Sequence, residues 1–76
     1  MRDKILEILC SACGNDIVKK DTSINLYDNM LMDSLALIEL TEGLEDELGI
    51  VLQPTQLSRE DLETPENIIR AVERAL

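Results

Sequence analysis

Residues 33–49 read DSLALIELTEGLEDELG, and this stretch decides the fold of the chain. Asp33 and Ser34 are both candidates for a helix N-cap, because a short polar side chain can accept a hydrogen bond from the free N–H groups of the first turn. Gly49 marks the end, since glycine readily adopts the left-handed conformation that closes many helices. The stretch therefore predicts a helix over residues 34–48. At 100° per residue its core face consists of Leu37, Leu40, Leu44 and Leu48, with Thr41 beside them.

Two apolar side chains of this helix, Leu35 and Ile38, fall outside that stripe. Leu35 lies about opposite the centre of the stripe, among carboxylates. Scattered surface hydrophobes are ordinary, and that is the plain alternative for either residue alone. Their place directly after Asp33-Ser34 predicts instead a docking surface for a basic partner. The residues assigned to this surface are Leu35, Ile38, Glu39, Glu42 and Asp46.

Helical patterns also lie on both sides of this stretch. Residues 3–13 have apolar side chains at helical spacing and are followed by Gly14, which predicts a first helix. Residues 15–32 scatter a few apolar positions among polar ones, which predicts a long ordered loop; connections of this length tend to be functional. The run SREDL at residues 58–62 resembles a capping pattern and predicts one short helical turn. Thr64 as N-cap and Pro65 open the last helix, whose apolar side is predicted to be Ile68, Ile69, Val72 and Leu76.

Together these elements predict an all-α fold. It is a small bundle of three main helices plus one short helical turn around one core, with the long loop between the first two helices. The apolar share of 45% is too high for an acidic disordered tail. Seventy-six residues suffice for one small domain at most, so we expect residues 1–76 to form a single domain.

Composition excludes several classes of function. The chain has 16 acidic and 7 basic residues, so it lacks the basic footprint that nucleic acid requires. It has no histidine and one aromatic residue, Tyr27, which argues against an independent enzyme. No apolar run exceeds four residues, so no membrane span of about twenty is expected. The N-terminus shows no secretory signal, and we expect a cytoplasmic protein.

The acidic excess is concentrated in the middle of the chain. From Asp21 to Ser58 there are eight acidic residues and no Lys or Arg. Such a stretch repels itself, and a purely structural helix can avoid this with Lys partners one turn away. A solvated acidic face kept for solubility is one explanation. Steering of basic partners toward the helix is the other, and the sequence favours it.

Cys10 and Cys13 form a C-x-x-C motif, which occurs in redox and metal sites. Zinc needs four ligands, and the chain has no third Cys and no His. The pair also lies late in a helical pattern, whereas a thioredoxin-like pair belongs at a helix N-terminus after a strand. We expect no metal site and two partly buried thiols that act as small hydrophobes.

Ser34 is the candidate for the chemically used position. Asp-Ser before an apolar helix is by itself only a capping signal. Here the serine also follows a long loop, precedes the outward Leu35 and Ile38, and lies within the cation-free acidic stretch. This combination predicts that the protein carries or presents a group at Ser34 rather than catalysing a reaction.

The run LMDSL at residues 31–35, followed by Glu39 and Leu40, resembles the Asp-Ser-Leu attachment site of acyl carrier proteins. The resemblance covers essentially the whole chain in helix order and length. Within that superfamily the chain is most similar to D-alanyl carrier proteins of teichoic acid synthesis. The residues that suggest this subfamily are Asp16-Ile17-Val18-Lys19, Leu26-Tyr27-Asp28, Leu48-Gly49-Ile50 and Thr64-Pro65 with Ile68-Ile69.

The resemblance implies a covalent 4′-phosphopantetheine arm, taken from coenzyme A, on the Ser34 hydroxyl, with Asp33 beside it in the cofactor-binding site. It also implies three kinds of partner: a phosphopantetheinyl transferase (holo-carrier synthase), a cargo-activating ligase or acyltransferase, and a downstream enzyme that accepts the acyl group. The cargo would be D-alanine for lipoteichoic acid, held as a thioester. A monomer is expected, because the carrier visits several enzymes in turn.

Two alternatives stay open. Leu35 is the ordinary residue after the serine in fatty-acid and polyketide carriers, so a fatty-acid, polyketide or peptidyl carrier is the first. The second is a helical interaction module that is never modified, in which Ser34 serves only as a cap.

Overall fold

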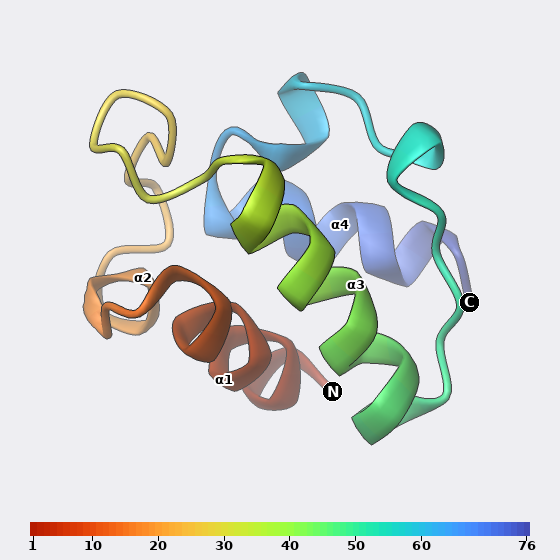
Figure 1. Cartoon of the computed structure of the whole chain (residues 1–76). Helices are drawn as coiled ribbons and strands as arrows, with labels where there is room; N and C mark the ends of the chain where they lie inside the picture. The colour runs from red at the N-terminus through yellow and green to blue at the C-terminus, as the bar shows by residue number, and fades with distance from the viewer.

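The computed structural model describes residues 1–76 and contains only helices and turns (Figure 1). The α-helices are α1 (Arg2–Cys13), α2 (Ile17–Lys20), α3 (Ser34–Leu48) and α4 (Pro65–Arg74). Two 3-10 turns lie between α3 and α4, namely η1 (Pro54–Gln56) and η2 (Glu60–Leu62). None of the helices combines the length and hydropathy of a membrane-spanning segment. The all-α prediction is confirmed, and α2 and η1 are additions to the predicted elements.

α3 begins and ends where the sequence predicts, whereas α1 begins one residue earlier than predicted and α4 ends at Arg74, before the predicted Leu76. Of the two N-cap candidates, Asp33 caps α3: its Oδ1 accepts a hydrogen bond of 2.8 Å from the N–H of Ala36. The side chain of Thr64 caps α4 in the same way. Gly14 and Gly49 follow α1 and α3 with φ of 68° and 67°, a region that glycine enters without steric cost.

One core of sixteen buried apolar side chains joins the helices. α1 and α3 pack closely at Gly43, where an added Cβ would lie only 2.6 Å from Cγ2 of Ile8. A side chain at this position would therefore push the two helices apart, and glycine is needed for their close approach.

The buried face of α3 agrees only in part with the predicted stripe. Leu40, Thr41 and Leu44 are buried as predicted. Leu37 and Leu48 are only half-buried, whereas Ala36 is buried. The reason is that α1 approaches on the side of Gly43, which extends the buried stripe toward Ala36.

The apolar side of α4 is also shorter than predicted. Ile68, Ile69 and Val72 are almost fully buried. Leu76 is 69% exposed, so its assignment to the core is wrong. The helix ends at Arg74, and the last two residues no longer follow its buried face.

The segment 15–32 is a loop interrupted by one helical turn, α2. The sequence did not predict α2, because four residues are too few to show a helical period. Val18 of α2 is fully buried. Leu26 is also fully buried and holds the rest of the segment: its N–H donates to Glu63 O at 2.7 Å, and its carbonyl accepts from Leu31 and Met32.

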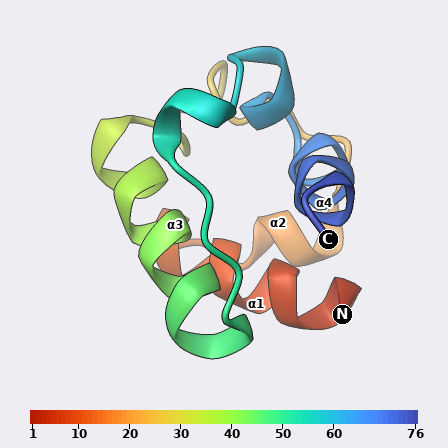
Figure 2. The same ribbon diagram turned by 90° about the vertical axis from the view of Figure 1, so that its right-hand side faces the viewer.

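The connection after α3 runs back along the molecule to the end at which α3 begins (Figure 2). As a result η2 and the segment before α3 lie at the same end of the bundle (Figures 1 and 2). The N–H of Glu66 donates to Thr22 O at 3.0 Å, which attaches this segment to the start of α4 as well.

Candidate functional site

Ser34 is the first residue of α3, and its side chain is exposed. Asp33 holds the helix start, since its carboxylate accepts the N–H of Ala36 and its carbonyl accepts the N–H of Leu37 at 3.0 Å. The N–H groups of Ser34 and Leu35 are left without a partner in the chain. The Ser34 hydroxyl therefore lies beside two free donors at the positive end of the helix dipole.

The residues around Ser34 are anchored although its hydroxyl is open to solvent. Two positions before it, Met32 is 5% exposed, and two positions after it, Ala36 is also 5% exposed. Both belong to the buried part of the protein, so the short stretch between them has little freedom to shift. An external enzyme would meet the hydroxyl in a defined place.

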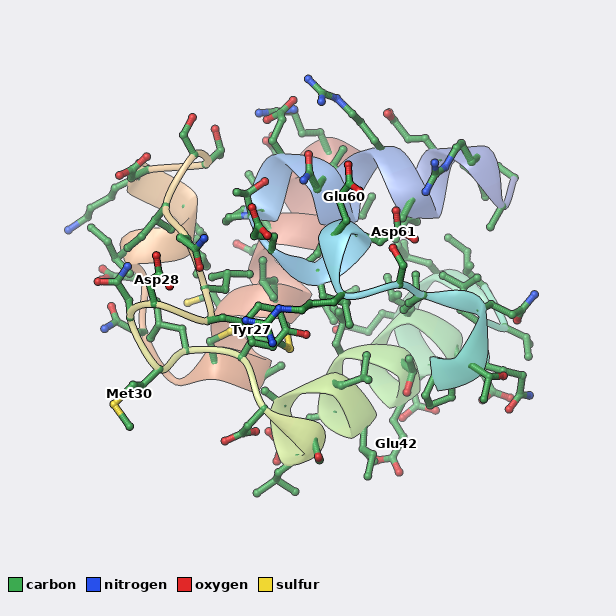
Figure 3. All side chains as sticks on the ribbon, turned by 90° about the horizontal axis from the view of Figure 1, so that it is seen from above. Tyr27, Asp28, Met30, Glu42, Glu60 and Asp61 are labelled. Atoms are coloured by element: carbon green, nitrogen blue, oxygen red, sulfur yellow. The ribbon has the colours of Figure 1, made fainter.

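All five predicted partner-binding residues are exposed on α3. Leu35 is 65% exposed and Ile38 46%. The three acidic members line one side of a shallow groove between α3 and α1: Glu39, Glu42 and Asp46. Figure 3 shows Glu42 projecting outward from α3. The structure thus places apolar and acidic side chains together on the exposed surface of one helix.

The acidic side chains of α3 have no cation partner within the chain. The four ion pairs of the structure are Arg2–Glu66, Lys19–Glu7, Lys20–Asp16 and Arg74–Asp61. All of them lie outside residues 21–58. The negative field of α3 is therefore not neutralised internally and remains available to attract a basic partner.

Cys10 and Cys13 are free and half-buried, as predicted. Burial, reinforced by the neighbouring Cys10 and Asp33, raises the pKa of the Cys13 thiol to about 11. Cys13 is therefore protonated at neutral pH and is a poor nucleophile and metal ligand. No group of His, Cys, Asp and Glu side chains is arranged to hold a metal ion.

The sequence prediction missed two features close to Ser34. Met30 has φ of 58° and is 89% exposed. Methionine itself does not indicate this conformation, because glycine or asparagine is the usual residue there. The guanidinium of Arg59 lies 4.1 Å from the centroid of the Tyr27 ring. Arg59 is the one Lys or Arg among residues 21–69, and Tyr27 is the one aromatic residue of the chain. This composition indicates the cation–π pair only weakly.

The family described as the phosphopantetheine attachment site matches residues 3–72. The chain belongs to this family. Its cofactor is therefore 4′-phosphopantetheine, held covalently, and its role is that of a carrier. The exposed serine at a helix N-terminus with two free N–H groups fits the phosphate of such a group.

Curated relatives of this carrier chain include several D-alanyl carrier proteins. The one from Abiotrophia defectiva is 31% identical over 74 residues, covering 97% of this chain and 94% of the relative. The one from Lacticaseibacillus rhamnosus is 32% identical over 75 residues, with 99% and 93% covered. The one from Listeria monocytogenes serotype 4b is 36% identical over 72 residues, with 95% and 92% covered. The predicted resemblance to D-alanyl carriers is confirmed.

Proposed function

We propose that Ser34 is the attachment residue of the 4′-phosphopantetheine arm and that the protein carries D-alanine on it for lipoteichoic acid. The observation that supports this most is the position of Ser34 as the exposed first residue of α3, between the cap Asp33 and the outward Leu35. Residues 1–76 would form one carrier domain that acts as a monomer.

The surroundings of Ser34 suit a phosphodiester. The free N–H groups of Ser34 and Leu35 can donate to its oxygens, and the helix dipole favours negative charge at this end. Asp33 remains engaged with Ala36, so the cap persists while the neighbouring hydroxyl is modified. No rearrangement of the helix start is needed to accept the group.

Attachment requires coenzyme A and a separate transferase. The Ser34 oxygen forms a bond to the phosphorus that carries pantetheine, and the bond from this phosphorus to the rest of the diphosphate breaks. The product 3′,5′-adenosine bisphosphate leaves, and the hydroxyl proton passes to the transferase or to solvent. Because the arm comes from coenzyme A, we place the protein in the cytoplasm.

The attached arm supplies a thiol for the cargo thioester. The chain itself contributes the tether, which converts encounters of cargo and enzyme into reactions at high effective concentration. D-alanine is the cargo favoured by the relatives, which are named as D-alanyl carrier proteins. The further partners would be a ligase that activates D-alanine and an enzyme that accepts it.

The proposed partner surface is the exposed part of α3 near Ser34. Leu35 and Ile38 would supply apolar contact. The rim of unneutralised carboxylates would attract basic enzymes: Glu39, Glu42 and Asp46. This surface begins next to the attachment residue and continues along α3, so docking there brings a partner to the arm.

Mass measurement on the intact protein tests the attachment. The apo protein, incubated with coenzyme A and a promiscuous phosphopantetheinyl transferase, should gain the mass of one arm. Ser34→Ala should gain none, whereas the control Ser11→Ala, at another exposed serine, should gain it as wild type does. No gain in wild type, or a gain that survives Ser34→Ala, overturns the proposal.

A loading comparison tests the cargo. The holo protein is offered to a D-alanine-activating ligase with ATP and D-alanine, and separately to a malonyl transferase with malonyl-coenzyme A. D-alanyl thioester should form faster than malonyl thioester, as measured by mass. Preferential malonyl loading would reject D-alanine and favour a fatty-acid or polyketide carrier.

A further inference from the structure

Met30 combines two features that stability does not explain. Its side chain is 89% exposed, the highest value among the large apolar residues of the chain. Its backbone has φ of 58°, in the left-handed region that L-residues other than glycine, asparagine and aspartate rarely occupy. Figure 3 shows the side chain projecting from the loop before α3 into solvent. An exposed apolar residue in a strained backbone conformation indicates a functional role.

The conformation of Met30 is imposed by backbone hydrogen bonds around it. Its own N–H donates to Tyr27 O at 3.1 Å, and the next two N–H groups donate to Leu26 O at 2.8 and 3.2 Å. Leu26 in turn is fixed through its N–H to Glu63 O at 2.7 Å. The loop therefore holds Met30 outward independently of its side chain, and a polar residue of similar size would fit the fold equally well.

The exposed large apolar residues are concentrated in the part of the sequence around Ser34. The chain has six large apolar residues that are exposed, and three of them lie within residues 30–38: Met30, Leu35 and Ile38. Met30 precedes Ser34 by four residues, and Leu35 follows it directly. A flexible thioether side chain adapts well to the pocket of a partner.

We propose that Met30, together with Leu35, forms the apolar contact by which the phosphopantetheinyl transferase binds the apo protein. This rests on Ser34 being the attachment residue. The transferase is the occupant because it alone must bring a reacting phosphorus into bonding distance of the Ser34 oxygen. It must therefore cover the chain on both sides of that residue, whereas later enzymes reach the thiol at the far end of the arm.

Charge supports the same occupant. Asp28, Asp33 and Glu39 lie within six residues of Ser34 in the sequence, are exposed, and have no ion-pair partner in the chain. Coenzyme A carries a diphosphate and a further phosphate, so the enzyme that binds it needs basic residues near its reacting centre. A basic surface with an apolar pocket complements this part of the carrier.

Substitution of Met30 tests the contact. Met30→Gln replaces the thioether with a polar side chain of similar size, Met30→Leu keeps an apolar one, and Val51→Gln alters an equally apolar residue, 62% exposed, beyond the far end of α3. Initial rates of arm attachment at varied apo-protein concentration give KM and kcat. Calorimetric titration of apo protein into transferase, without coenzyme A, gives the Kd.

We expect Met30→Gln to raise KM and Kd by about five- to tenfold with kcat unchanged, the loss that corresponds to one partly buried apolar contact. Met30→Leu and Val51→Gln should stay close to wild type. Met30→Gly should weaken binding like Met30→Gln while relieving the backbone strain, so a loss seen in both variants cannot come from misfolding.

Unchanged KM and Kd for Met30→Gln and Met30→Gly overturn the contact even when wild type is modified normally. Equal weakening by Met30→Leu and Met30→Gln also overturns it, because the contact would then not be apolar. A wild-type protein that gains no arm instead overturns the role of Ser34, so the two failures are distinguishable.

Discussion

The guanidinium carbon of Arg59 lies 4.1 Å above the ring of Tyr27. Tyr27 belongs to the segment that leads to Ser34, and Arg59 immediately precedes η2. Figure 3 shows Tyr27 between α3 and η2 at this end of the bundle. The contact adds a side-chain link to the backbone hydrogen bond from Leu26 to Glu63, so the segment before the attachment residue rests on the C-terminal part of the chain.

We predict that Arg59→Gln lowers the free energy of unfolding by about 0.5–1 kcal/mol, the usual contribution of an exposed cation–π contact. Urea denaturation measures this. Arg70→Gln, which removes an exposed arginine without an ion pair, is the control. The loss should disappear when Arg59→Gln is made in a Tyr27→Leu background; an equal loss there contradicts the contact.

Gly43→Ala should destabilise the protein although alanine favours helix by about 1 kcal/mol over glycine. The new Cβ would meet Cγ2 of Ile8 at 2.6 Å, and this methyl is on a stiff β-branched side chain. Overpacking of this kind costs about 1–3 kcal/mol. In an Ile8→Ala background the clash is absent, so there Gly43→Ala should raise the free energy of unfolding. If Gly43→Ala raises the free energy of unfolding in wild type as well as in the Ile8→Ala background, the clash with Ile8 is not costly and α1 and α3 separate freely.

Asp33→Ala should lower the free energy of unfolding by about 1 kcal/mol, because the Ala36 N–H loses its acceptor at the start of α3. Asp33→Asn keeps an oxygen in the capping position and should lose less. Thermal or urea denaturation of both variants separates capping from charge. Equal losses for the two would mean that the carboxylate charge, rather than the cap, stabilises the helix start.

Charge reversal of Glu39 and Glu42 to lysine should slow arm attachment about three- to tenfold at low salt, because the field that attracts the transferase is reversed near Ser34. The difference should shrink at high ionic strength, which screens exposed charges. The single reversal Glu73→Lys on α4, compared with the single reversals of Glu39 and of Glu42, is the control for net charge. Equal rates for wild type and the double variant at low salt would remove steering from the explanation of the acidic surface.

Glu66 should make the stability of the fold sensitive to acid. Its carboxylate forms a double hydrogen bond with the guanidinium of Arg2, at 2.7 and 3.0 Å, which holds the pKa of Glu66 below its usual value. A carboxylate with a lowered pKa stabilises the folded state above its unfolded pKa, and this is lost as the pH falls through the folded pKa. Between about pH 5 and pH 3 the Glu66→Gln variant should lose less stability than wild type. The measurement is the free energy of unfolding of wild type and Glu66→Gln as a function of pH. Parallel curves for the two proteins would contradict the acid-sensitive role of Glu66.

Capping residues and glycines in the sequence predict the starts of α3 and α4 and the ends of α1 and α3. Asp33, Thr64 and the glycines after α1 and α3 act within one turn of their own positions, so their effect can be predicted without knowledge of the fold. The outward position of Leu35 follows from helical periodicity alone and is confirmed by its 65% exposure. The prediction of Ser34 needed more than the local capping signal: it also rested on the long loop before it, the outward Leu35 and Ile38, and the cation-free acidic stretch.

The tertiary structure decided what depends on residues far apart in the chain. Ala36 is buried because α1 approaches α3 at Gly43. Met30 is held outward in a left-handed conformation because Leu26 is fixed to Glu63, thirty-seven positions later. Capping and periodicity act over about four residues, whereas these contacts exist only once the chain has closed on itself. The sequence therefore determined the helices and the serine, and the packing of distant segments determined the surface that a partner meets around it.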